Sequence, residues 1–76
     1  MTHVQHRFGL EVRRRRLALG WSQERLAGAA DLNRSYMGEI ERGSVTPSLE
    51  TAAKLARALG VPLWELIYRS EVPACA

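Results

Sequence analysis

The stretch that decides the fold covers residues 22–43 and reads S-Q-E-R-L-A-G-A-A-D-L-N-R-S-Y-M-G-E-I-E-R-G. Ser22 and Asn33 are both suited to the N-cap of a helix, because a side-chain oxygen can accept a hydrogen bond from an amide one turn in. Each follows a large apolar residue, as in a hydrophobic staple. Since the two caps are close in sequence, they leave room for a short helix, a bend at Asp31 and a second short helix. Aspartate is one of the few residues besides glycine that tolerates a left-handed backbone at such a bend.

The second helix, expected over about Asn33–Arg42, separates apolar from polar side chains by angle. Met37 and Ile40 are three residues apart and face the core. The opposite side carries or is flanked by Arg34, Ser35, Tyr36, Gly38, Glu39 and Arg42. An ordinary solvated helix face is the plain alternative. However, a short helix with a small central residue also fits the major groove of DNA, which is roughly 12 Å wide. The pattern therefore favours a DNA-binding helix-turn-helix.

Three blocks of sequence resemble the helix-turn-helix family of phage repressors and Cro-like proteins, often called XRE-type. The blocks are L-A-L-G-W-S-Q-E-R-L-A, I-E-R-G and T-P-S-L-E-T-A-A-K-L-A-R-A-L-G-V-P, in family order within residues 8–67. Within the family, N-R-S-Y-M-G-E-I-E-R-G is most similar to the controller proteins of restriction–modification systems. The resemblance implies an all-α, five-helix bundle of the lambda-repressor-like type, with the helix-turn-helix at its second and third helices.

Composition limits the other function classes. The chain has 76 residues, 46% of them hydrophobic and 25% charged, with a net charge of +3, which is typical of one small folded domain. The only cysteine, Cys75, excludes an internal disulfide and a cysteine-based zinc site. With neither a signal peptide nor an apolar run of ~20 residues, we expect a cytoplasmic protein without a membrane partner. No catalytic cluster or phosphate loop is visible, so we expect no enzyme, cofactor, metal or small-molecule ligand.

We expect a flexible lead over residues 1–7, the DNA-binding domain over residues 8–69 and a flexible tail over residues 70–76. The expected helices cover about Phe8–Leu19, Gln23–Ala30, Asn33–Arg42, Thr46 or Ser48 to Leu59, and Pro62–Tyr68. The sequence leaves the cap of the fourth helix open between Thr46 and Ser48. Helical spacing places these residues in the core: Phe8, Val12, Leu19, Leu26, Ala27, Ala30, Met37, Ile40, Leu49, Ala52, Leu55, Ala56, Leu59 and Leu66.

The resemblance also implies an ion pair between Arg16 and Glu41, which would tie the first helix to the end of the recognition helix. A partly buried pair of this kind fixes geometry more reliably than it adds stability. Arg15 departs from the family, which usually has an apolar residue at this position. The packing around Arg15 is therefore an open question.

DNA contacts divide into two classes, those that position the protein on phosphates and those that read bases. We assign phosphate positioning to Ser22, Gln23, Asn33, Arg42 and Ser44. We assign base reading to Arg34, Ser35, Tyr36 and Glu39. Arg34 can make two hydrogen bonds to guanine, and Glu39 can accept one from cytosine N4.

The last helix is too apolar for a small domain to bury completely. We expect Leu66 to complete the core and the neighbouring apolar residues to form a homodimer interface: Leu63, Trp64, Ile67 and Tyr68. A two-fold dimer would place two recognition helices about 34 Å apart on a pseudo-palindromic operator. Two alternatives stay open. Trp64 could cover the core of a monomer, or the fold could serve mainly as an antitoxin-like module that binds another protein.

Overall fold

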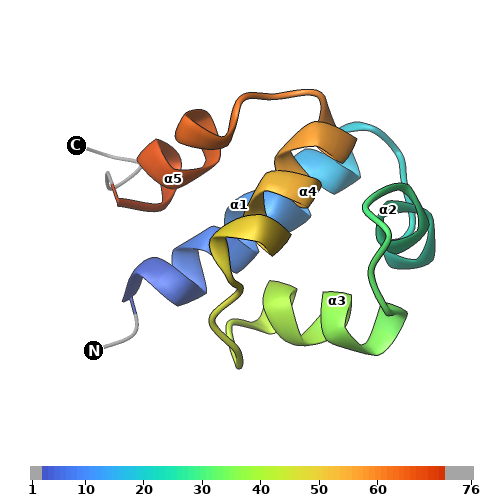
Figure 1. Ribbon diagram of the computed structural model, residues 1–76, viewed down its shortest axis with the longest axis horizontal. Helices are drawn as coiled ribbons and strands as arrows, with labels where there is room; N and C mark the ends of the chain where they lie inside the picture. The colour runs from blue at the N-terminus through green and yellow to red at the C-terminus, as the bar shows by residue number, and fades with distance from the viewer. Residues whose placement is uncertain (1–2, 72–76) are drawn as a thin grey trace.

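The computed structural model describes residues 3–71, and this part of the chain consists of five helices with no strand. The helices are α1 (His3–Ala18), α2 (Gln23–Ala29), α3 (Arg34–Arg42), α4 (Leu49–Leu59) and α5 (Leu63–Glu71). Figure 1 shows α1 and α4 crossing the middle of the domain, with α3 on one side and α5 on another. α1 packs against α3, α4 and α5, so it is the central helix of the bundle. The predicted all-α, five-helix architecture is confirmed.

The predicted start signals of α2, α3 and α4 are all in place. The Ser22 Oγ accepts from the amide of Arg25 over 3.0 Å, and Asn33 Oδ1 accepts from the amides of Ser35 and Tyr36 over 2.8 and 3.3 Å. The open choice for α4 resolves to Ser48, whose side chain accepts from the Thr51 amide. These oxygens accept hydrogen bonds from amides that have no backbone partner in the first turn of a helix.

Asp31 has the left-handed backbone that the sequence predicts at the bend, with φ of 58°. A single residue in this conformation lets the chain reverse between α2 and α3 without a longer loop. At the other end of α3, Gly43 adopts φ of 77° and its amide bonds back to the Ile40 carbonyl. The recognition helix is therefore closed at both ends by local contacts.

The core forms where the helical spacing predicts it, with two exceptions. Its buried side chains are Phe8, Val12, Leu26, Ala27, Ala30, Met37, Ile40, Ala52, Leu55, Ala56, Leu59 and Leu66. Leu19 was wrongly predicted: it is 48% exposed, because α1 ends at Ala18 and Leu19 lies in the turn beyond. Leu49 was also wrongly predicted and is 77% exposed. It is the first residue of α4. Helical spacing predicts the side of the helix on which Leu49 lies, but it does not predict whether another helix covers that end of α4.

The folded domain extends further at both ends than the sequence predicts. α1 begins at His3 rather than Phe8, and the Gln5 amide nitrogen donates to the carbonyl oxygen of Gly43 over 2.5 Å. α5 continues to Glu71, and the buried Ser70 hydroxyl donates to the Leu66 carbonyl over 2.7 Å. Residues 3–7 and 70–71 are thus helical, not lead and tail. The remainder of the predicted tail, with Cys75, lies outside the described residues.

Gly9 allows α1 to approach α3 closely, a contact that the sequence does not predict. A Cβ atom at this position would lie 2.2 Å from the Ile40 carbonyl oxygen and 2.8 Å from that of Glu41. Backbone atoms cannot move aside as a side chain can. A glycine inside a helix weakens that helix, so it usually has a packing reason. Here the reason is contact between the two helix backbones.

Candidate nucleic-acid interface

The outer face of α3 and the beginning of α2 together form an open polar hollow. Its walls are Gln23, Arg34, Ser35, Gly38, Glu39 and Arg42. Arg34, Ser35 and Arg42 are exposed, whereas Glu39 is half-buried and Gly38 is buried. Met37 and Ile40, on the other side of the helix, are fully buried. The fold therefore brings five of the predicted DNA-contacting residues to one surface and leaves that surface free of other helices of the described chain.

The other predicted DNA-contacting residues lie at the margins of this hollow or are used in the fold. Tyr36 is half-buried and packs against the core. Ser22 and Asn33 cap α2 and α3. Ser44 follows the end of α3, and its hydroxyl donates to the Glu39 carbonyl over 3.1 Å. All four stand at helix ends or on the flank of α3, and their DNA contacts stay predictions.

The ion pair that fixes this surface to the core is Arg16 with Glu41. Arg16 donates from Nε to Glu41 Oε2 over 2.7 Å and from Nη2 to Oε1 over 3.0 Å, and its Nη1 donates to the Trp21 carbonyl over 2.8 Å. Both side chains are more than nine-tenths buried. The hydrogen bonds to Glu41 raise the pKa of Arg16 above its ordinary value, against the opposing effect of burial. The pair joins α1 to the last turn of α3.

Gln23 extends this buried pair to the surface. Its amide nitrogen donates to Glu41 Oε1 over 3.0 Å. One N–H of Gln23 is thus engaged inside the protein, and a phosphate contact would use its second N–H, because a primary amide carries two donors. The side chain is held in place before any ligand arrives.

The α5 surface is apolar and open. Trp64 is 66% exposed and Tyr68 53% exposed, while Leu63 and Ile67 are half-buried against the core. The four line a shallow hollow together with Glu71. Leu66 is fully buried, as predicted, and completes the core. The described chain leaves a cluster of large apolar side chains in contact with solvent.

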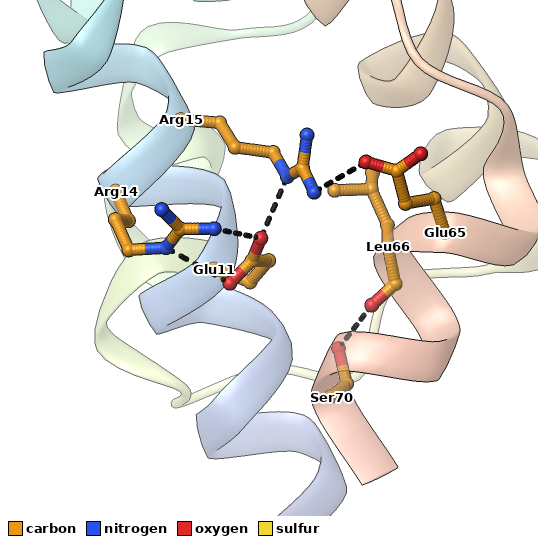
Figure 2. Close-up of polar contacts among 6 residues, drawn as sticks. All are labelled: Glu11, Arg14, Arg15, Glu65, Leu66 and Ser70. Carbon is orange, nitrogen blue, oxygen red and sulfur yellow. Dashed lines mark hydrogen bonds and ion pairs between the residues drawn. The ribbon is translucent and has the colours of Figure 1, made fainter. Parts of the chain in front are cut away.

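One ion pair, Arg15 with Glu65, joins α1 to α5, and Figure 2 shows it beside two ion pairs within α1. Arg15 lies between two carboxylates, with Nε 2.6 Å from Glu11 Oε2 and Nη2 2.6 Å from Glu65 Oε2. Arg14 makes a second ion pair with Glu11, over 2.7 Å. Arg15, whose packing the sequence leaves open, is thus accommodated by two ion pairs. Burial alone would raise the pKa of Glu11, but hydrogen bonds from Arg14 and Arg15 outweigh it and lower the pKa.

Two kinds of site are absent from the part of the chain that the structure describes. No group of three or more histidine, cysteine, aspartate or glutamate side chains is arranged to hold a metal ion within it. None of its helices is long and apolar enough to cross a membrane.

Comparison with known proteins gives consistent relatives. A family model described as helix-turn-helix matches residues 12–66. The chain is 41% identical over 69 residues to control protein C.BamHI of Bacillus amyloliquefaciens, covering 90% of this chain and 85% of that protein. It is 36% identical over 67 residues to control protein C.MunI of a Mycoplasma species, covering 87% and 90%. The crystal structure of the restriction-modification controller protein C.AhdI from Aeromonas hydrophila has a TM-score of 0.79 at 45% identity, covering 82% and 94%.

Proposed function

The chain belongs to the helix-turn-helix family of DNA-binding transcriptional regulators, and we propose that it binds a pseudo-palindromic operator as a homodimer. The observation that carries this proposal is the polar hollow between α2 and α3. Its residues come from the two helices of the helix-turn-helix and face away from the core. In such domains the second of the two helices enters the major groove, while the first crosses the backbone.

Within this hollow, we assign base reading and phosphate positioning by location. Arg34 and Ser35 are exposed in the first turn of α3, the part of a recognition helix that reaches base edges. Glu39 lies one turn further along; a carboxylate repels phosphate but accepts from cytosine. Arg42, at the end of α3, and Gln23, at the start of α2, also line the hollow. We assign these two residues to contacts with the phosphate backbone of the DNA. The amides at the start of α2 add a favourable site for a phosphate.

The α5 surface supplies the second half of the proposal. Trp64 and Tyr68 are largely exposed beside the half-buried Leu63 and Ile67. Large exposed apolar clusters in small proteins are typical of partner surfaces, and a second copy of the chain buries the same cluster on both sides of a two-fold axis. A domain of this size also gains stability from association, since it has a small core.

The proposal is tested first at Arg34. The DNA is selected by the wild-type protein from a pool of random duplexes, and binding is measured by fluorescence anisotropy. Arg34→Ala should weaken binding to the selected site by about 1–3 kcal/mol, the value of a two-bond contact to a base, and should barely change binding to random DNA. The control is Arg57→Ala, which removes the same charge from α4, where it lines a separate hollow. An equal loss on both DNAs would exclude Arg34 from base reading.

The dimer is tested at Trp64. Trp64→Ser should shift the protein from dimer to monomer in analytical ultracentrifugation and leave its helical content unchanged, because the side chain is outside the core. Leu49→Ser is the control, since Leu49 is a smaller apolar side chain that is even more exposed, at 77%, on α4. The control should associate like the wild type. If Trp64→Ser also does so, the α5 surface is not the interface.

The alternative function, an antitoxin-like module that binds mainly a protein partner, would use the same α5 surface. Salt separates the two: DNA binding through phosphates weakens steeply and linearly on a log–log plot of affinity against salt. A protein-directed module would show no binding to any duplex at low salt.

The named relatives favour a role beside restriction–modification genes in the bacterial cytoplasm. Neighbouring genes for a methyltransferase and an endonuclease would support this role, and a neighbouring toxin gene would contradict it.

A further inference from the structure

Gly38 occupies the centre of the DNA-facing surface of α3, yet it is buried. The covering group is the guanidinium of Arg42, one turn further along the same helix. A Cβ atom at position 38 would lie 3.2 Å from Arg42 Nη1 and 3.8 Å from Gln23 Oε1. The Arg42 side chain thus folds back along α3 and ends over the one position in this turn that has no side chain.

An added Cβ atom at this glycine would meet no backbone atom of another helix within 4 Å. At Gly9 the nearest atoms to an added Cβ are backbone atoms of α3, whereas at Gly38 they are side-chain atoms of Arg42 and Gln23. A glycine inside a helix weakens it relative to alanine, and α3 has only nine residues. Gly38 therefore lowers the helix propensity of α3, and it leaves room for the Arg42 guanidinium.

Gln23, which also lies close to position 38, is itself fixed. Its amide nitrogen donates to Glu41 over 3.0 Å, and Glu41 is bound at two points by Arg16. The carbonyl oxygen of Gln23 lies 3.8 Å from the place that a Cβ atom of residue 38 would take. Gln23 therefore links the buried ion pair to the surface of the hollow at position 38.

We propose that Gly38 is a positioning residue for DNA binding: because it lacks a side chain, the Arg42 guanidinium lies over position 38, where it and the Gln23 amide hold one backbone phosphate of the DNA. This inference rests on the proposed function, since it concerns how the same surface holds DNA. The partner it names is the phosphate of a duplex, recognised by one guanidinium and one amide.

If the Arg42 guanidinium depends on the space at position 38, one substitution should stabilise the fold and weaken DNA binding. A Cβ at 3.2 Å from Nη1 is closer than ordinary van der Waals contact, so the guanidinium must move by a few tenths of an ångström. The end of a long flexible side chain moves at little cost to folding, so Gly38→Ala keeps the gain in helix propensity. The phosphate contact loses its geometry, because charge-assisted hydrogen bonds need good alignment.

The test compares Gly38→Ala with Gly28→Ala. Gly28 also lies inside a helix, on α2, and an added Cβ there meets nothing within 4 Å. Both variants should raise the urea midpoint of unfolding. Only Gly38→Ala should weaken DNA binding, by about three- to tenfold, as expected when a hydrogen bond to a charged group is impaired. It should also lower the slope of log affinity against log salt by about one, the value for one phosphate contact.

A double-mutant cycle with Arg42→Ala decides whether Gly38 acts through Arg42. If it does, Gly38→Ala causes no further loss of affinity once Arg42 is absent. An equal loss with and without Arg42 would overturn the inference, as would a Gly38→Ala variant that binds DNA like the wild type. Both of these results leave the proposed function intact. A wild-type protein that binds no duplex at low salt would instead overturn the proposed function and this inference with it.

Discussion

Removing one partner of the Arg16–Glu41 ion pair should cost the protein a large part of its stability. Arg16→Met keeps an unbranched apolar stem, shorter than the arginine side chain, and takes away the charge and three hydrogen bonds. The Glu41 carboxylate, whose side chain is 3% exposed, is then left with Gln23 as its one remaining side-chain donor in the described structure. Leaving a buried charge without its partner costs about 3–5 kcal/mol. A chain of 76 residues has a total stability of about 4–11 kcal/mol at the usual value per residue.

The assay is urea unfolding followed by circular dichroism at neutral pH. Arg16→Met should lose about 3–5 kcal/mol of the free energy of unfolding. The double variant Arg16→Met/Glu41→Gln should recover a large part of that loss, because it contains no buried charge. The reasoning would be refuted by a single variant that loses less than about 1 kcal/mol, the value of an exposed pair. It would also be refuted by a double variant no more stable than the single one.

Three further predictions concern folding. Gly9→Ala should destabilise the protein by about 3 kcal/mol or more in the same urea assay, because its Cβ would overlap backbone atoms of α3; a loss of less than about 1 kcal/mol would contradict the close approach. The lowered pKa of Glu11 adds stability that is present above its ordinary value of 4.5 and is lost as the pH falls through the folded-state value. Glu11→Gln should therefore be less stable than the wild type at pH 7 by an amount that shrinks under acid conditions, and a constant difference would exclude the linkage. Asp31→Val should lower the free energy of unfolding by about 1–2 kcal/mol because of its left-handed backbone, whereas Asp31→Gly should be nearly neutral; equal losses would contradict this cause.

The sequence predicts the helix-turn-helix well because its signals are local. The caps at Ser22 and Asn33 each depend on contacts within one turn, and the inward orientation of Met37 and Ile40 depends on spacing alone. These short-range features are visible in the chain before it folds. The Arg16–Glu41 pair joins distant parts of the sequence, and its prediction depended on resemblance to a family.

The sequence predicts less well whatever depends on which helices lie together. Leu49 has the right angle for the core but stands at the end of α4, where no other helix of the described chain covers it. Gly9 and Gly38 are both helix-interior glycines, and only the structure distinguishes them. Gly9 lies against backbone atoms of α3, whereas Gly38 lies against side-chain atoms of Arg42 and Gln23. The early start of α1 was missed because its charged residues surround the helix and give little apolar contrast.

The Arg15–Glu65 ion pair adds a salt-sensitive contact to the apolar packing of Leu66 that holds α5 in the bundle. Dissolved ions screen partly exposed charge pairs, and both Arg15 and Glu65 retain some contact with water. The ions that compete with the protein for DNA thus also loosen the helix that carries the proposed dimer surface. In that dimer, a rise in ionic strength would weaken both the binding of each subunit to DNA and the association of the two subunits. The occupancy of an operator would therefore fall over a narrower range of salt concentration than either effect alone produces.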